Sequence, residues 1–162
     1  MALLRERWVL TLATIAPGEP LYTTPLFYAV APDRHAGPQL VFASRPESTH
    51  GRHLGEGPTA VAAALYLESH DIAELRGVQL RGVVVPTATA ASLATYLERH
   101  PGAEPLLRAG ARERLYALTV TWAKLTDNRL GFGYKREWTF VASQDDEGPP
   151  HKTGCAVDTD SD

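Results

Sequence analysis

The sequence predicts a mainly β (α+β) protein: a small antiparallel barrel of six or seven strands, with one long and one or two short helices packed outside it. Three observations carry this prediction. Apolar residues alternate with period two along most of the chain, only one segment has a clear helical period, and a short helical turn separates the third and fourth strands. Antiparallel strands joined by short turns commonly close into such barrels.

The strands are predicted from alternating apolar residues bounded by turn residues. Pro17-Gly18-Glu19-Pro20 forces the first turn, and a polar segment over residues 31–38 separates the second and third strands. In the sixth strand, Trp122 is expected to share one face with Tyr116 and Val120. The predicted strands cover residues 8–13, 21–30, 40–44, 59–67, 76–85, 114–125 and 136–141.

The helices are fewer and shorter. Between residues 87 and 100, Leu93, Tyr96 and Leu97 fall at helical spacing, Thr87 or Thr89 can cap the start, and Pro101-Gly102 ends the helix. A shorter helix is predicted over residues 104–109, and a helical turn over residues 49–54.

Length and charge predict one domain, residues 1–142, followed by an acidic tail, residues 143–162. The tail holds six acidic residues against Lys152 and almost no bulky apolar residue, so we expect it to be disordered. It contributes −5 to the net charge of −3, which leaves the body at +2. That surplus is too small for a typical nucleic-acid binder.

Several features indicate a cytoplasmic protein. No apolar run approaches the ~20 residues that cross a bilayer, and the N-terminus lacks the cation-then-apolar order of a signal peptide. The single cysteine, Cys155, can form no internal disulfide, which fits a reducing compartment. We therefore expect no membrane partner.

The turn after the third strand is the most informative segment for function. Ser48, Thr49 and the backbone amides of a short helix can donate hydrogen bonds to phosphate oxygens, and Arg45, His50 and Arg52 can supply positive charge. Ser48 and Thr49 can equally serve only as helix caps. His50 and His53 are three residues apart but lack a third metal ligand nearby, so we expect no metal and expect both histidines to face solvent.

The order of elements, together with Leu40–Ser44, Glu47–His50 and Leu54 before a Gly-Pro turn, resembles the pyridoxamine 5′-phosphate oxidase-like FMN-binding split β-barrel superfamily. The block from Lys124 to Trp138 resembles an uncharacterised bacterial branch of it more closely still. The likeness covers residues 5–141. It implies a split barrel that binds FMN at the interface of a homodimer.

The resemblance also implies site residues. Histidine stands at position 50 where the family usually has lysine, which exchanges a permanent charge for one that titrates near neutrality. Thr23 replaces an arginine of the oxidase. Gln79 is placed at the polar edge of the flavin ring, although alignment through Gly82 puts the oxidase's glutamine at Gly77, on the same face. The implied cofactor-binding residues are Thr23, Thr24, Pro25, Ala43, Ser44, Arg45, Ser48, Thr49, His50 and Gln79. Near the C-terminus, Tyr134, Lys135 and Trp138 are implied as a substrate pocket that reaches the partner's flavin.

The function expected from this resemblance is that of an FMN-dependent oxidoreductase acting on a small molecule, with the flavin performing the redox chemistry. No catalytic residue is assigned. Two alternatives stay open: a non-catalytic flavin or haem carrier or sensor on the same fold, and a small β-barrel interaction module without a cofactor.

Overall fold

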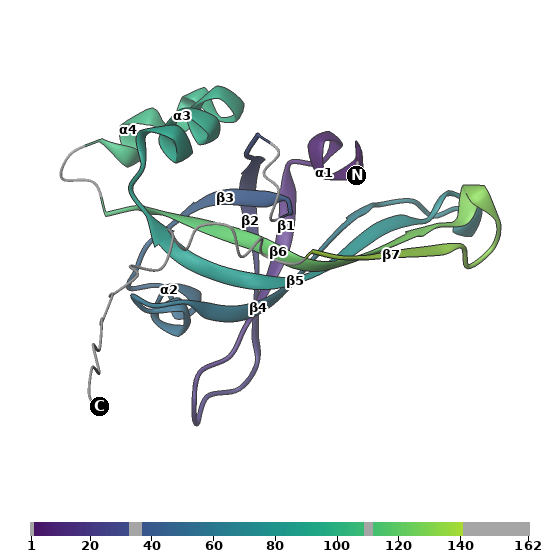
Figure 1. Cartoon of the computed structure of the whole chain (residues 1–162), viewed down its shortest axis with the longest axis horizontal. Coiled ribbons are helices and arrows are strands. Elements are labelled where there is room, and N and C mark those ends of the chain that lie inside the picture. The colour runs from purple at the N-terminus through teal and green to yellow at the C-terminus, as the bar shows by residue number, and fades with distance from the viewer. Residues whose placement is uncertain (1, 33–36, 109–111, 141–162) are drawn as a thin grey trace, which may run out of the picture.

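The computed structural model describes residues 2–32, 37–108 and 112–140, and the predicted acidic tail and Cys155 lie outside these ranges. The predicted fold class is confirmed: the chain is mainly antiparallel β with few short helices (Figure 1). The strands are β1 Val9–Thr14, β2 Tyr22–Val30, β3 Gln39–Ser44, β4 Thr59–Leu67, β5 Arg76–Thr87, β6 Arg114–Asp127 and β7 Lys135–Thr139. The helices are α1 Ala2–Glu6, α2 Thr49–Leu54, α3 Ala90–Arg99 and α4 Glu104–Leu107, with short 3₁₀ helices η1 Ile72–Glu74, η2 Pro101–Ala103 and η3 Asn128–Leu130.

Six strands close into a barrel, and β7 adds to it from outside. The order in the sheet is β3-β2-β1-β4-β5-β6-β7, and β3 also pairs with β6, which closes the ring. β6 makes this possible by its length. Its first half pairs with β3 from Arg114 to Thr119, whereas its second half pairs with β7 from Trp122 to Thr126.

The barrel interior is filled by one face of each strand. Leu10, Leu12, Phe42, Leu80 and Leu118 are almost fully buried there, as the period-two pattern predicts. A second, smaller core lies where α3 and α4 cover the outer face of the sheet. Its buried members are Ala29, Ala31, Val41, Tyr96 and Leu115.

The predicted orientation of Trp122 is wrong. A bulge lies between Arg81 and Gly82 of β5: Gly82 pairs with Val120 of β6, but Arg81 pairs with Trp122, so Thr121 has no partner in the register. One extra residue reverses the alternation beyond it. Ala123 therefore points into the core, and Trp122 contacts the guanidinium of Arg81 at 4.7 Å from its ring centroid.

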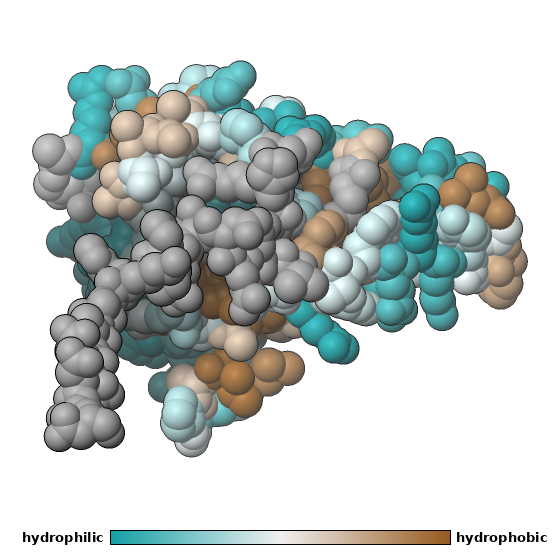
Figure 2. All heavy atoms as spheres, in the orientation of Figure 1, coloured by the Kyte–Doolittle hydropathy of each residue, from teal (hydrophilic) through white to brown (hydrophobic). Residues whose placement is uncertain are grey.

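The hairpins β4–β5 and β6–β7 extend together as an arm on one side of the barrel (Figure 1). Asn128 connects them at the tip, because its backbone N–H donates to the carbonyl of Leu75 and its side-chain amide donates to that of Ile72. The tip is apolar and exposed, as the brown spheres at the end of the arm in Figure 2 show, and Phe132 is 83% exposed.

The predicted long helix is confirmed as α3, and Thr89 caps it by accepting a hydrogen bond from the backbone N–H of Ser92. Among the described residues, no helix has the length and apolar character needed to cross a membrane.

Candidate functional site

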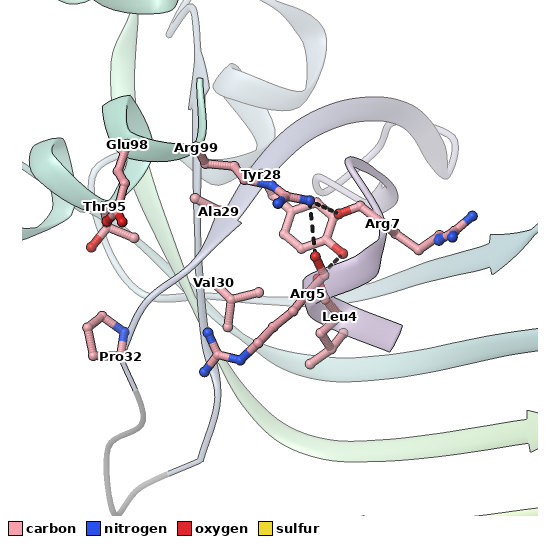
Figure 3. Close-up of a pocket in the computed structure, with 10 residues that line it drawn as sticks. All are labelled: Leu4, Arg5, Arg7, Tyr28, Ala29, Val30, Pro32, Thr95, Glu98 and Arg99. Carbon is pink, nitrogen blue, oxygen red and sulfur yellow. Dashed lines mark hydrogen bonds between the residues drawn. The ribbon is translucent and has the colours of Figure 1, made fainter. Parts of the chain in front are cut away.

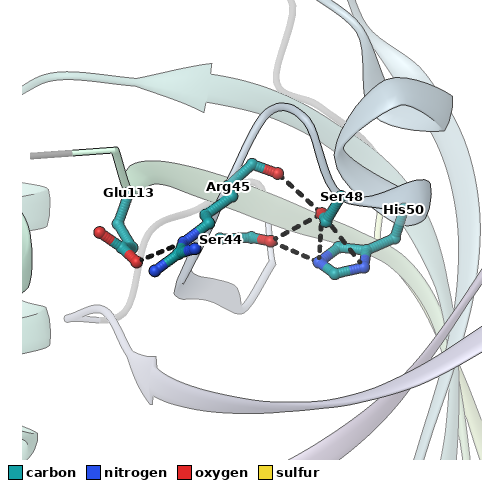
Figure 4. Close-up of polar contacts among 5 residues, drawn as sticks. All are labelled: Ser44, Arg45, Ser48, His50 and Glu113. Atoms are coloured by element: carbon teal, nitrogen blue, oxygen red, sulfur yellow. Dashed lines mark hydrogen bonds and ion pairs between the residues drawn. The ribbon is translucent and has the colours of Figure 1, made fainter.

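The turn between β3 and α2 brings Ser44, Ser48 and His50 into one hydrogen-bonded cluster at the end of the barrel (Figure 4). Ser44 Oγ bonds His50 Nε2, Ser48 Oγ lies 3.3 Å from Ser44 Oγ, and Ser48 Oγ lies 3.2 Å from His50 Nε2. Ser44 faces inward because it shares the face of Leu40 and Phe42 on β3. Three of the residues predicted to bind phosphate therefore lie within hydrogen-bond distance of one another.

Ser48 has the capping role that the sequence left open. Its Oγ accepts from the backbone N–H of Gly51 at 3.1 Å and donates to the carbonyl of Arg45 at 2.7 Å. Its hydroxyl hydrogen is thereby committed to the turn. Gly51 is required for this geometry, because a Cβ there would lie 2.2 Å from the Arg45 carbonyl oxygen.

His50 is buried, and the expectation that it faces solvent is wrong. The helical turn directs its ring inward, where it stacks on Tyr22 at a centroid distance of 6.4 Å and an interplanar angle of 7°. Burial lowers its pKa below the ordinary value of 6.5, and the nearby His53 lowers it further. His50 is therefore mainly neutral at pH 7 and acts through hydrogen bonding rather than charge.

His53 is also buried, which corrects the same expectation. Its Nδ1 lies 3.1 Å from Thr14 Oγ1, and its Nε2 lies 2.9 Å from a carboxylate oxygen of Glu19. The ring of Tyr22 meets it edge-on. This network fixes the β1–β2 hairpin against α2, and the hydrogen bond from His53 lowers the pKa of Glu19.

Sequence reasoning missed Tyr22, Thr14 and Glu19 as neighbours of the cluster. His53 is 34 residues from Glu19 and 39 from Thr14 in sequence, and no motif links them. Only the pairing of β1 with β2 and the packing of α2 against both strands bring them together.

Arginines lie on the segments beside the cluster, and two of them are paired with carboxylates. Arg45 uses Nε to bond Glu113 at 2.8 Å, and Arg114 bonds both carboxylate oxygens of Glu56 at 2.7 Å. These contacts raise the pKa of each guanidinium. Arg52 donates to a backbone carbonyl, that of Glu47, and within the described ranges it has no carboxylate partner.

The flavin-ring residues are distributed over two faces. Thr23 and Pro25 lie exposed on the outer face of β2, whereas Thr24 faces the side of Leu12. The side chain of Ala43 packs under α3 in the second core, so only its backbone could meet a ligand. Gln79 is exposed and lies in the same cross-strand row as Pro25, with Thr11 and Ala64 between them. Three strand spacings of ~4.8 Å place Gln79 about 14 Å from Pro25.

The predicted substrate residues lie far from the cluster within one protomer. On β6, Trp138 pairs with Ala123 and Ser44 pairs with Arg114. The segment of β6 from Arg114 to Ala123 is about 30 Å long at ~3.3 Å per residue. Tyr134 and Trp138 line one cavity at the base of the arm. Lys135 alternates to the opposite face of β7 and does not line that cavity.

A separate cavity of about 530 Å³ lies between α1, the end of β2 and α3 (Figure 3). Arg99 donates to the backbone carbonyls of Arg5 and Arg7 there, and its guanidinium carbon lies 3.5 Å from the ring centroid of Trp8. None of the predicted cofactor or substrate residues lines this cavity. Over residues 2–32, 37–108 and 112–140, no group of three or more His, Cys, Asp or Glu side chains could hold a metal ion.

Comparisons with known proteins support the fold. No family model matches the chain. A UPF0306 protein of Photorhabdus laumondii is 28% identical over 138 residues, which cover 83% of this chain and 90% of the relative.

Solved structures of similar fold carry cofactor-related names. The heme binding protein of Mycobacterium smegmatis has a TM-score of 0.68 at 21% identity over 85% of this chain, and this chain spans 55% of that protein. A Clostridium acetobutylicum protein of the pyridoxinephosphate oxidase family, related to general stress protein 26, has a TM-score of 0.60 at 11% identity, covering 85% of this chain and 89% of its own. The FAD binding protein of M. smegmatis has a TM-score of 0.54 at 16% identity, covering 86% and 92%.

Proposed function

We propose that this protein binds FMN at the interface of a homodimer and uses it to oxidise or reduce a small molecule. The observation that carries the proposal is the convergence of Ser44, Ser48 and His50 at the turn after β3, with Arg45 and Arg52 at its rim. A flavin or haem cofactor agrees with the names of the structural neighbours.

The groups of the turn fit a phosphate monoester, with roles that differ from those implied by the sequence. Arg45 binds Glu113 through Nε, which leaves its two terminal nitrogens as donors, and its side chain is 56% exposed. Among the described residues the Thr49 hydroxyl has no hydrogen-bond partner, so it can donate to a ligand. Arg52 supplies charge. Ser48 instead holds the shape of the turn, and the neutral His50 orients Ser44.

A homodimer is proposed because no helix or loop among the described residues covers one face of the sheet. The outer sides of β4 and β5 present small residues such as Ala62 and Ala64 beside exposed Tyr66 and Gln79. Pro25 belongs to the same face. Two protomers meeting there would place Gln79 of one beside the flavin of the other, together with Lys135.

Bound FMN would supply hydride or electron transfer. The chain's own contribution is to hold the phosphate through Arg45, Arg52 and Thr49, to exclude water where Tyr22 covers His50, and to leave the ring accessible to a substrate and an electron donor. Lys135→Ala tests the substrate assignment, and unchanged flavin reduction and substrate binding would remove Lys135 from the site.

Titration with FMN and with riboflavin, which lacks the phosphate, tests the proposal. We expect FMN to bind one per protomer at micromolar or lower concentration, and riboflavin at least about tenfold more weakly, since charged hydrogen bonds are worth ~1.5–3 kcal/mol each. Arg52→Ala should reduce this preference, whereas Arg108→Ala, an exposed arginine of the α3–β6 connection, should not. Size-exclusion chromatography should give a dimer. A monomer, or no FMN binding at micromolar concentration, would refute the proposal.

The second candidate function is haem binding without turnover. It is suggested by the heme binding protein of similar fold, which has a TM-score of 0.68. A Soret band after addition of hemin would distinguish it from flavin absorption. Oxidation of NADH or NADPH with FMN present would separate an enzyme from a carrier. If the protein binds neither cofactor, the remaining candidate is a β-barrel interaction module without a cofactor.

A further inference from the structure

The base of the arm contains a second, partly open cavity of about 300 Å³ between α1 and the strands β5, β6 and β7. Leu3, Val78 and Leu125 form its apolar part, and Tyr134 and Trp138 supply aromatic walls. Trp138 is partly buried and packs against the barrel core. A cavity of this size that combines apolar and aromatic walls with charged side chains can hold a small molecule.

Arg76 is the polar group in this cavity whose bonding is incomplete. Its side chain is 18% exposed, and its Nε is buried without a hydrogen-bond partner among the described residues. Its ion-pair partner, Glu6, lies 3.6 Å from Nη1, too far for a hydrogen bond, and Glu6 is 44% exposed. A buried guanidinium N–H without an acceptor is unfavourable, and a water or an anion bound from outside is one way to supply that acceptor.

The other carboxylate of the cavity does not satisfy Arg76. Asp127 accepts hydrogen bonds from Arg129 through both of its oxygens, at 3.0 and 2.8 Å. Arg136 adds a further cation, 5.1 Å from the centroid of the Trp138 ring. The lining thus has three arginines against two carboxylates, and the excess charge is positive.

We propose that this cavity binds a small planar anion, an aromatic ring bearing a carboxylate or a phosphate, with Arg76 as the group that receives the anion. Arginine presents a planar fork that matches either oxyanion, and Trp138 and Tyr134 can contact an aromatic ring. Within one protomer the cavity is separate from the β3–α2 turn, because about 30 Å of β6 lies between Ala123, the partner of Trp138, and Arg114, the partner of Ser44.

The test uses the indole N–H signals of ¹⁵N-labelled protein, without added flavin. The chain has three tryptophans, so Trp8 and Trp122 serve as internal controls for Trp138. Benzoate and phenyl phosphate are titrated as anions, and benzamide as the neutral equivalent of benzoate. We expect a saturable shift of the Trp138 signal alone, with benzamide at least about tenfold weaker. The tighter of the two anions identifies the oxyanion preferred.

Arg76→Gln should weaken anion binding at least about tenfold, while Arg108→Gln, a remote exposed arginine, should leave it unchanged. Tyr134, a wall of the cavity, is 38% exposed, so Tyr134→Leu is expected to fold and should also weaken anion binding. This variant keeps the test decisive if Arg76→Gln does not fold. No Trp138 shift up to about 10 mM of either anion, equal binding of benzamide, equal shifts of all three indoles, or wild-type binding by a folded Arg76→Gln protein would overturn the proposal. FMN binding can succeed or fail separately.

Discussion

Replacing Gly51 by alanine is the sharpest test of how the β3–α2 turn is built. The new Cβ would lie 2.2 Å from the carbonyl oxygen of Arg45 and 2.7 Å from that of Pro46, where ordinary contact begins at 3.4 Å. Both neighbours are backbone atoms of the turn that carries Ser44 and Ser48. The turn must therefore open by about 1.2 Å, and overpacking of this kind costs ~1–3 kcal/mol.

Gly57→Ala provides the matched control, because a Cβ at Gly57 would meet nothing within 4 Å. We expect urea unfolding to show Gly51→Ala destabilised by ~1–3 kcal/mol, or about 2–12 °C in Tm, and Gly57→Ala within about 0.5 kcal/mol of wild type or slightly more stable. FMN affinity should fall only in Gly51→Ala. If the two variants unfold at the same urea concentration, the close approach at Gly51 is wrong.

Two further predictions concern buried polar groups. Burial lowers the pKa of His50 in the folded state, so the unfolded chain protonates His50 more readily than the folded chain does. The stability that depends on neutral His50 is therefore present above the unfolded pKa of about 6.5 and is lost as the pH falls below that value. Between about pH 5 and 7, the free energy of unfolding in urea should therefore change less with pH in His50→Gln than in wild type or in His70→Gln, an exposed control. The same pH dependence in all three proteins would contradict a buried His50. Tyr116→Phe should be neutral or stabilising, because the Tyr116 hydroxyl is buried without a partner among the described residues, whereas Tyr28→Phe should cost ~0.5–1.5 kcal/mol through loss of the 2.7 Å bond to the Leu4 carbonyl. Thermal unfolding checks both tyrosine variants, and a larger loss in Tyr116→Phe would reverse the assignment.

The strand boundaries were predictable because alternation is a local property. The prediction of β4 over residues 59–67 matches the structure, and Thr89 was among the two caps expected for α3. Trp122 marks the limit of this reasoning. A bulge depends on how two strands pair, and nothing within β6 indicates that Thr121 lacks a partner in β5.

The site was predictable in part for the same reason. Ser44, Ser48 and His50 lie within seven residues of one another, and the turn necessarily brings them close. Their roles were not local. Whether Ser48 faces a ligand or caps α2 is decided by the backbone N–H of Gly51, and whether His50 carries charge is decided by burial beneath Tyr22.

The sequence by itself determined the seven strands, the helices α2, α3 and α4 and the polar turn after β3, since each depends on residues that are near neighbours in the chain; α1 was not predicted. Only the tertiary structure decided the exposure and bonding of His50 and His53, the separation of Trp138 from Ser44 and the incomplete bonding of Arg76. Burial and hydrogen-bond satisfaction are set by segments that meet across the barrel, and pairing between such segments is not encoded in any one of them.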